Sequence, residues 1–229
     1  MKYELETIPV WEALKCDTEC LLCHLADQAH SDAVSYYLGD SVMNPPTRVA
    51  LNEKGFCPTH WASLQAGGHP HSLALIGHTH LQQTIKELEP LLLAGSKKQS
   101  YLKKLSQVIT KRSSGCLICT QIQQRMERYS YTVAVLWEQD SQFQEALANS
   151  KGFCLYHLPQ VVKMGQTNEF VQAMGTLMLA NLKRLEQEIW WMSQKYKDEN
   201  KDKPWNGSQD AHKRVVEKLI GRSRLYAEP

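Results

Sequence analysis

The sequence lacks an apolar run long enough to span a bilayer and lacks an excess of charge of one sign. No stretch of its 229 residues approaches the roughly 18 consecutive apolar residues of a membrane-spanning helix. The first ten residues hold Glu4 and Glu6 where a secretion signal would be basic and then apolar. A net charge of +2 is too small to wrap a nucleic acid. We expect a soluble cytoplasmic protein that binds neither membranes nor nucleic acid.

Signatures of the common enzyme classes are also missing. The chain has no nucleophile elbow, no glycine-rich phosphate-binding loop and no paired carboxylates in a catalytic arrangement. Acidic residues fall mostly on the polar faces of the expected helices, which is their usual place. We therefore do not expect a catalytic role.

Apolar residues recur at the spacing of helices. Hydrophobic residues make up 42% of the chain, and in the segments after Cys20 and after Cys116 they return every three to four positions, as expected for amphipathic helices. No segment alternates as a half-buried strand would. The pattern predicts an all-α protein, a helical bundle in which each C-x-x-C opens a helix.

Seven cysteines in a chain without an export signal are more often metal ligands or redox groups than structural disulfides. Six of them fall on an internal repeat. The string Cys-Leu-Leu-Cys at 20–23 recurs as Cys-Leu-Ile-Cys at 116–119, and Gly-Phe-Cys-Pro-Thr-His at 55–60 recurs as Gly-Phe-Cys-Leu-Tyr-His at 152–157. The two offsets differ by a single residue, which chance does not readily produce.

The repeat predicts how the chain is organised. We expect a first repeat with its N-terminal and connecting segments at 1–107 and a second repeat at 108–195. A polar linker and a short C-terminal helix, which ends at Gly221, then occupy 196–229. In each repeat a further long helix follows the C-x-x-H motif, and a short helix containing Leu102 and Ile109 connects the repeats.

Each repeat then supplies three cysteines and one histidine, a donor set suited to zinc. Two residues three apart in a helical turn point to the same side, so C-x-x-C and C-x-x-H each present a converging pair of ligands. We predict two metal sites, one in each repeat, with two zinc ions as the cofactors. The first comprises Cys20, Cys23, Cys57 and His60, and the second Cys116, Cys119, Cys154 and His157.

Other uses of the same residues stay open. Three thiolates and an imidazole also hold iron–sulfur clusters, which would make an electron-transfer or redox-sensing protein. A thiol oxidoreductase using one C-x-x-C is a further alternative. Covalent haem attachment is rejected although Cys20 to His24 match its motif, because no export signal is seen and Thr120 replaces the histidine in the second repeat.

Some residues lie outside the repeat pattern. Four histidines without counterparts in the second repeat fall within a dozen positions: His69, His71, His78 and His80. They could form a second transition-metal or catalytic site, but we favour the simpler interpretation that they cap a loop and lie on a helix face. Cys16 has no repeat partner. The pair Trp190-Trp191 and the terminal helix offer surfaces to a protein partner, whose identity the sequence does not name.

The paired C-x-x-C and Gly-Phe-Cys-x-x-His motifs, with the polar segment around Trp205 and the short last helix, resemble an uncharacterised bacterial family known only as a domain of unknown function. The resemblance covers nearly the whole chain. This sequence departs from it in the leucines after Cys20 and Cys116 and in His24 and Thr120, where a basic residue often stands. The resemblance supports the metal ligands and implies no reaction.

Overall fold

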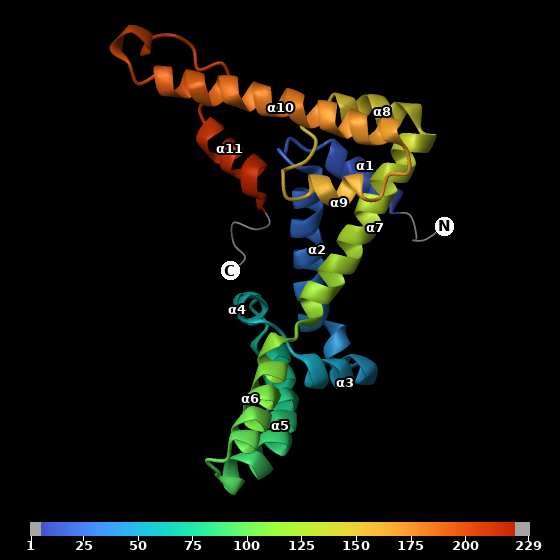
Figure 1. Ribbon diagram of the computed structural model, residues 1–229, viewed down its shortest axis with the longest axis vertical. Coiled ribbons are helices and arrows are strands. Elements are labelled where there is room, and N and C mark those ends of the chain that lie inside the picture. Colours follow the sequence, from blue (N-terminus) through green and yellow to red (C-terminus); the bar gives the residue numbers. More distant parts are fainter. Residues whose placement is uncertain (1–5, 223–229) are drawn as a thin grey trace. The chain divides into compact units, whose positions relative to one another are not determined.

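A computed structural model describes residues 6–222 of the protein (Figure 1). These residues form eleven α-helices and two short 3₁₀ helices, and none of them lies in a strand. The all-α class predicted from the apolar spacing is therefore confirmed. Within the described residues, every helix is too short or too polar to cross a bilayer.

The chain divides into two compact units that do not follow the sequence repeat. One, here called the inserted unit, is residues 29–123, and the other, the terminal unit, joins the preceding and following parts of the chain. The polypeptide passes between the units inside two helices, α2 (Leu21–Leu38) and α7 (Leu117–Gln139). The division at 1–107, 108–195 and 196–229 describes the sequence repeat and stays a prediction.

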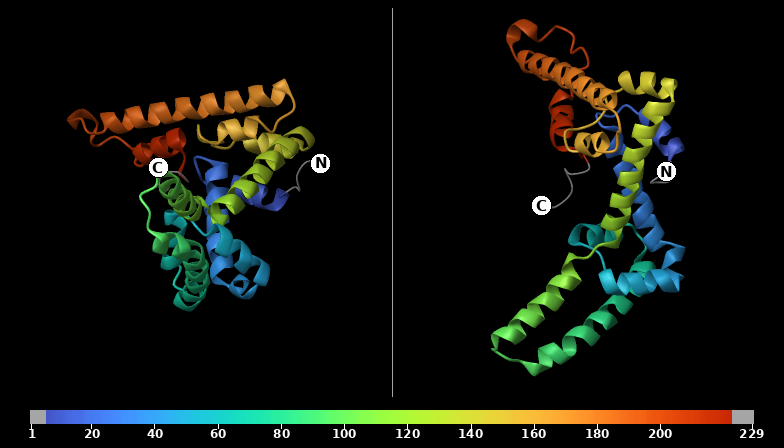
Figure 2. Two further views of the ribbon diagram at one scale, coloured as in Figure 1. Left: turned by 60° about the horizontal axis from the view of Figure 1, so that its bottom comes forward. Right: turned by 45° about the vertical axis from the view of Figure 1, so that its right-hand side comes forward.

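The terminal unit contains α1 (Thr7–Leu14), α8 (Ser141–Ala148) and α9 (Leu158–Val162), together with the first turns of α2 and the greater part of α7, and α1 packs against α8. The long helix α10 (Asn168–Gln194) packs against α9 and against α11 (Ala211–Ile220), with the 3₁₀ helix η2 (Asp198–Asn200) between α10 and α11 (Figure 2). Side chains with no solvent exposure, such as Leu22, Phe143 and Phe170, form its core.

In the inserted unit, the rest of α2 leads through the 3₁₀ helix η1 (Asp40–Met43) to α3 (Pro45–Lys54) and α4 (Pro58–Ala66). Two longer helices, α5 (Pro70–Ala94) and α6 (Gln99–Ser114), then run antiparallel as a hairpin (Figure 2). Three of these helices start with proline, whose missing N–H costs nothing in the first turn. Phe56, Leu64 and Ile118 belong to the core of this unit.

The helices predicted around the motifs are present. α2 and α7 follow the two C-x-x-C pairs, α5 and α10 follow the C-x-x-H pairs, and α6 and α11 are the connecting and last helices. The sequence reading missed α1, α3 and α8. These helices span only eight to ten residues, too few to show a clear helical period.

Candidate metal centres

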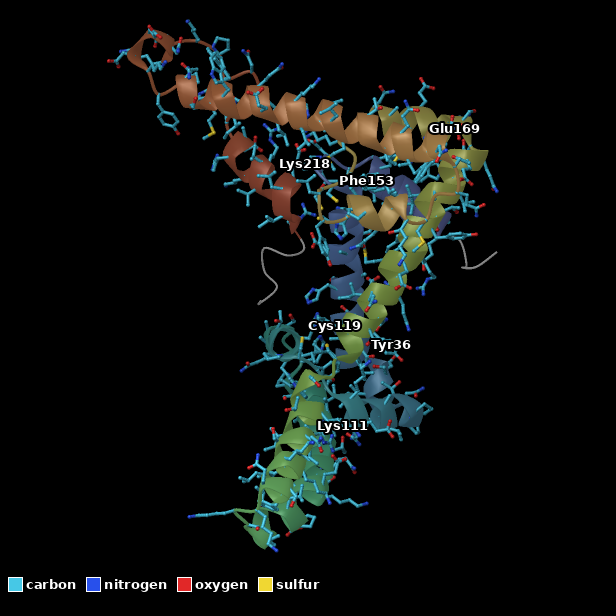
Figure 3. All side chains as sticks on the ribbon, in the orientation of Figure 1. Tyr36, Lys111, Cys119, Phe153, Glu169 and Lys218 are labelled. Atoms are coloured by element: carbon cyan, nitrogen blue, oxygen red, sulfur yellow. The ribbon has the colours of Figure 1, made fainter. Side chains whose placement is uncertain are left out.

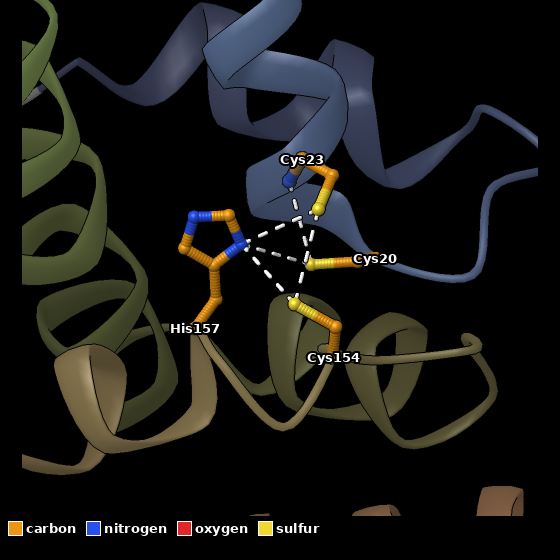
Figure 4. Close-up of side chains that lie close together, drawn as sticks. All are labelled: Cys20, Cys23, Cys154 and His157. Atoms are coloured by element: carbon orange, nitrogen blue, oxygen red, sulfur yellow. Dashed lines mark hydrogen bonds between the residues drawn. The ribbon is translucent and has the colours of Figure 1, made fainter. Parts of the chain in front are cut away.

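Four side chains of the terminal unit converge on one point, here called the terminal site. The sulfurs of Cys20 and Cys23 each lie 3.4 Å from Nδ1 of His157, and the sulfur of Cys154 lies 3.3 Å from it. The sulfurs of Cys23 and Cys154 are 3.8 Å apart. Figure 4 shows the three sulfurs and the imidazole nitrogen facing a common centre, and all four side chains are buried.

A second set of the same composition, the inserted site, lies in the inserted unit. Nδ1 of His60 lies 3.1 Å from the sulfur of Cys57, 3.2 Å from that of Cys116 and 3.3 Å from that of Cys119. The sulfurs of Cys57 and Cys119 are 3.8 Å apart. In each site all four donor atoms lie within 4.8 Å of one another.

All eight predicted ligands are therefore assembled, but the predicted pairing is wrong. We expected Cys20 and Cys23 to meet Cys57 and His60 within one repeat. Instead each C-x-x-C meets the C-x-x-H of the other repeat.

Helix length explains the exchange. α2 has 18 residues, so at about 1.5 Å per residue it carries the chain about 27 Å from its first turn before the next C-x-x-H motif begins. Composition could not reveal this, because either pairing gives each site three cysteines and one histidine.

A matching backbone hydrogen bond joins the two motifs in each site. The N–H of Leu21 donates to the carbonyl of Gly152 at 3.0 Å, and the N–H of Leu117 donates to that of Gly55 at 3.1 Å. Each bond holds the first turn of a C-x-x-C helix against the Gly-Phe-Cys segment of the other repeat. The carbonyl satisfies an N–H that the helix itself leaves without a partner.

Both glycines are required by the backbone. Gly55 and Gly152 have φ of 65° and 67°, which residues with a side chain rarely adopt. A Cβ at Gly55 would lie 2.8 Å from the ring of His80, and one at Gly152 would lie 3.1 Å from Leu177. The repeated Gly-Phe pair thus marks a turn whose glycine admits a close neighbour and whose phenylalanine is buried in the core.

The helix openings favour thiolates. Cys20 and Cys116 stand directly before α2 and α7, and their sulfurs accept hydrogen bonds of 3.3 Å from the N–H groups of Cys23 and Cys119. Free N–H groups at a helix N-terminus stabilise negative charge on a sulfur, although burial and the neighbouring thiols outweigh this effect on the pKa of Cys20.

The two C-x-x-H pairs differ in detail. Cys57 is the N-cap of α4 with Pro58 in the first turn. In the terminal site, however, Cys154 and His157 form a turn closed by the N–H of Leu158 on the carbonyl of Cys154, and α9 begins only after the histidine. The convergence of the ligands therefore needs a turn between them, which a helix or a single loop can supply.

The three thiols of each site lie so close together that their pKa values are shifted in different directions. In the terminal site, burial and the neighbouring thiols hold the pKa of Cys20 well above its usual range, while hydrogen bonds from Cys154 and Cys20 hold the pKa of Cys23 far below it. Burial lowers the pKa of His157, but hydrogen bonds with Cys154 and Cys23 outweigh it and raise the value to about 9.

The inserted site behaves similarly. Burial acts to raise the pKa of Cys116, yet hydrogen bonds, first that with His60, lower it to about 6, whereas burial and Cys116 raise the pKa of Cys119. Like charges this close repel, so the neighbouring thiols act to raise the pKa of Cys20 in one site and of Cys119 in the other. A divalent metal ion removes that repulsion and lets all three thiols bind as thiolates.

The C-terminal helix covers the terminal site, a feature that sequence reasoning missed. Lys218 of α11 is fully buried, and its Nζ donates to the carbonyls of Glu19, Lys151 and Phe153 (Figure 3). In return the N–H of Leu155 donates to the carbonyl of Lys218 at 2.9 Å. The lysine thus ties α11 to both segments that supply the Cys and His residues of the terminal site.

A buried carboxylate balances that lysine. Glu19, directly before Cys20, is 2% exposed and pairs with Arg184 at 2.6 Å, with Lys218 at 3.3 Å and with Arg214 at 3.5 Å. Because a buried charge is costly without partners, this network keeps the α11 lysine and the first ligand helix together.

The end of α11 reaches the ligands themselves. Gly221 has φ of 87°, and a Cβ there would lie 3.2 Å from the sulfur of Cys154 and 3.7 Å from that of Cys23. The adjacent Arg222 pairs with Asp27 of α2 at 2.7 Å. The terminal site is consequently closed, whereas in the inserted site Cys57 is half-buried and Cys119 is exposed.

The remaining residues singled out from sequence stay outside both ligand groups. Of the four histidines, only His80 is half-buried; its Nδ1 lies 3.2 Å from the carbonyl of Leu51, and none of the four belongs to a set of three donors among the described residues. Cys16 is exposed, with its sulfur 3.6 Å from Nε2 of His24. Trp190 is largely exposed, and Trp191 donates to the carbonyl of Pro204.

These features define a class of protein: an all-helical chain with two sites of three cysteines and one histidine, each assembled from two motifs distant in sequence. The chain belongs to the family described as "Family of unknown function (DUF6062)", whose model matches residues 1–225. This agrees with the resemblance seen in the motifs.

One relative is similar over a shorter stretch. The chain is 24% identical over 147 residues to the "Uncharacterized 23.9 kDa protein in xynA 3'region" of Caldicellulosiruptor sp. (strain Rt8B.4), covering 64% of this chain and 67% of the relative. Comparison with solved structures gave no match.

Proposed function

We propose that the protein binds two structural zinc ions, one at each site, and acts as a non-catalytic accessory protein. The observation that supports zinc is the separation of 3.8 Å between facing sulfurs in both sites. A regular tetrahedron with zinc–sulfur bonds of about 2.3 Å has a sulfur–sulfur edge of about 3.8 Å. The side chains therefore already have the spacing that one tetrahedral ion needs.

The donor set supports a structural role for the ion. Four protein ligands fill the tetrahedral coordination of zinc and leave no position for water or substrate. Each ion would clamp two segments that are far apart in sequence, Cys23 and Cys154 in one unit and Cys57 and Cys119 in the other. Binding of structural zinc is worth about 10 kcal/mol or more, enough to hold the two segments of each site together.

The same separations favour a single ion over an iron–sulfur cluster. In a cluster with several irons the thiolates bind different iron atoms, so they stand farther apart than ligands of one ion. A thiol oxidoreductase needs an accessible C-x-x-C, but Cys20 and Cys23 are both buried. In the other pair only Cys119 is exposed, while Cys116 is buried. Both alternatives are kept as outcomes of the test.

The accessory role is supported by exposed apolar side chains on long helices. Ile85 and Leu92 of α5 and Trp190 of α10 are each more than half exposed. Side chains of this kind are typical of surfaces that meet another protein. The proposed partner is therefore a protein.

Metal analysis after anaerobic purification from medium without added metal tests the proposal. The expected result is a colourless protein with two zinc ions per chain. The control is Cys16→Ser, which replaces a cysteine outside both sites and should keep both ions. Iron and sulfide in the protein, with broad absorption near roughly 400 nm, would indicate an iron–sulfur cluster instead of zinc. A metal-free protein that forms a reversible disulfide between Cys20 and Cys23 would favour the oxidoreductase.

A further inference from the structure

A shallow apolar groove runs along the α5–α6 hairpin of the inserted unit. It has a volume of about 440 Å³ and is lined by residues of α4, α5 and α6, among them Trp61, Leu81, Leu88 and Ile109. The two hairpin helices lie side by side in both views of Figure 2. The groove has room for a few aliphatic side chains.

Large apolar side chains in the walls of this groove are exposed. Leu81 is 58% exposed and Ile109 is 46% exposed, although both are large and apolar. No residue of α6 is buried, and on α5 only Ile76 is. Two antiparallel helices with an unburied apolar face between them accept a third helix in the groove, which buries its own apolar stripe there.

Charge indicates what kind of helix fits. Residues 70–114 hold seven basic and two acidic residues, a net charge of +5 in a chain whose total is +2. One of the two carboxylates, Glu87, already pairs with Arg112 at 2.7 Å. α6 itself has no acidic residue. A hairpin of net positive charge with an apolar groove complements an acidic amphipathic helix and repels a basic one.

We propose that the α5–α6 groove binds an acidic amphipathic helix of a partner protein. Apolar side chains of that helix enter the groove between Leu81 and Ile109, and its carboxylates are attracted by the net positive charge of the hairpin. This inference rests on the proposed accessory role and specifies the chemistry of the partner.

The inserted metal site sets the shape of the groove. Trp61, which lines it, follows the ligand His60 directly, and its ring packs 5.2 Å from Phe56 and 5.8 Å from His80. α6, on the other wall, leads within two residues to the ligand Cys116. A metal ion that joins His60 to Cys116 therefore fixes one wall against the other, and its removal should weaken binding.

Two other occupants are disfavoured by the same features. A second copy of this chain would bring two hairpins of charge +5 together. A nucleic acid would use the basic residues but leave the apolar floor without a partner.

Fluorescence anisotropy with a labelled synthetic helix tests the proposal on the full-length, metal-loaded protein. The probe is an amphipathic peptide of about 18 residues with leucines along one face and glutamates on the other. A second peptide carries lysines in place of the glutamates. We expect the acidic peptide to bind at least about tenfold more tightly than the basic one and to bind more weakly as salt rises.

Variants then locate the binding surface. Ile109→Glu in the groove should weaken binding of the acidic peptide about tenfold or more, as expected for a central interface residue. The matched control is Leu93→Glu, on the same hairpin but 80% exposed and not part of the groove lining, which should leave binding unchanged. Circular dichroism and zinc content are measured on each variant, so that a misfolded protein is recognised.

Four results would overturn the inference. They are equal binding of both peptides, equal loss in the Leu93 control, a dimer in sedimentation that Ile109→Glu dissociates, and tighter binding of a short RNA duplex than of the acidic peptide. Zinc analysis of the same sample separates this inference from the proposed metal role. Two zinc ions without peptide binding refute the groove alone, whereas a metal-free protein refutes the structural zinc.

Discussion

In the terminal site Cys23 lies beneath the end of α11, whereas in the inserted site Cys119, which holds the same place in its motif, is exposed. The ligands, the helix openings and the backbone hydrogen bonds from Leu21 and Leu117 are otherwise alike. The motifs therefore set the geometry of both sites, and α11, a helix outside the motifs, covers the terminal site.

The largest effect we expect concerns which ligands share an ion. The double variant Cys23→Ser/Cys154→Ser disrupts one site and should retain one zinc ion per chain, whereas Cys23→Ser/Cys57→Ser disrupts both and should retain none, since a closed site needs its full ligand set. Metal analysis of purified protein measures both. If Cys23→Ser/Cys57→Ser instead retained one zinc ion and Cys23→Ser/Cys154→Ser none, the ligands would be paired within each repeat.

The second-largest effect should come from replacing the buried Lys218, which contacts the terminal site. Lys218→Met takes away the donor to three carbonyls and leaves the charge of Glu19 less well balanced, so we expect a loss of about 3 kcal/mol in unfolding free energy. Zinc transfer to a chromophoric chelator should become faster for one of the two ions only. Lys213→Met, an exposed position on the same helix, is the control. Equal acceleration for both ions would show that α11 does not protect one site specifically.

Glycine replacement tests whether the two turns are equivalent. Gly55→Ala and Gly152→Ala each place a side chain at positive φ next to a close neighbour, and each should cost about 1 to 3 kcal/mol in unfolding free energy. Gly175→Ala, in α10 with open space around it, should instead stabilise by about 0.5–1 kcal/mol. Thermal or urea unfolding gives these values. A neutral result at Gly55 or Gly152 would mean that the turn relaxes.

The smallest effect should come from the outer contact of the cover. Arg222 and Asp27 are both partly exposed, so Arg222→Ala should cost less than about 1 kcal/mol. Its effect on chelator-driven zinc loss should be far smaller than that of Lys218→Met. If the two variants released zinc equally fast, the seal would lie at the end of α11 rather than at the buried lysine.

Much of the candidate site was predictable because its signals are local. The C-x-x-C and Gly-Phe-Cys-x-x-His strings identified all eight Cys and His residues of the two candidate sites, and the apolar spacing after Cys20 and Cys116 identified α2 and α7. Gly55 and Gly152 were visible as repeated letters, but their positive φ and their neighbours His80 and Leu177 were not.

The cover of the terminal site had no readable signal. Lys218 lies in a strongly amphipathic helix in which a lysine usually faces water, and nothing nearby in sequence shows that it reaches the carbonyls of Lys151 and Phe153. Likewise Ile109 and Leu81 read as ordinary apolar positions of helices, and only the packing of α5 on α6 left them exposed.

The amino-acid sequence by itself determined the helical class and the eight Cys and His residues of the candidate sites, because helical periodicity and the three-residue spacing within each motif act within one or two turns of chain. The tertiary structure alone decided which pairs of ligands meet and which site is covered. Those outcomes depend on how far α2 and α7 carry the chain and on where α11 packs, distances that no short-range pattern encodes.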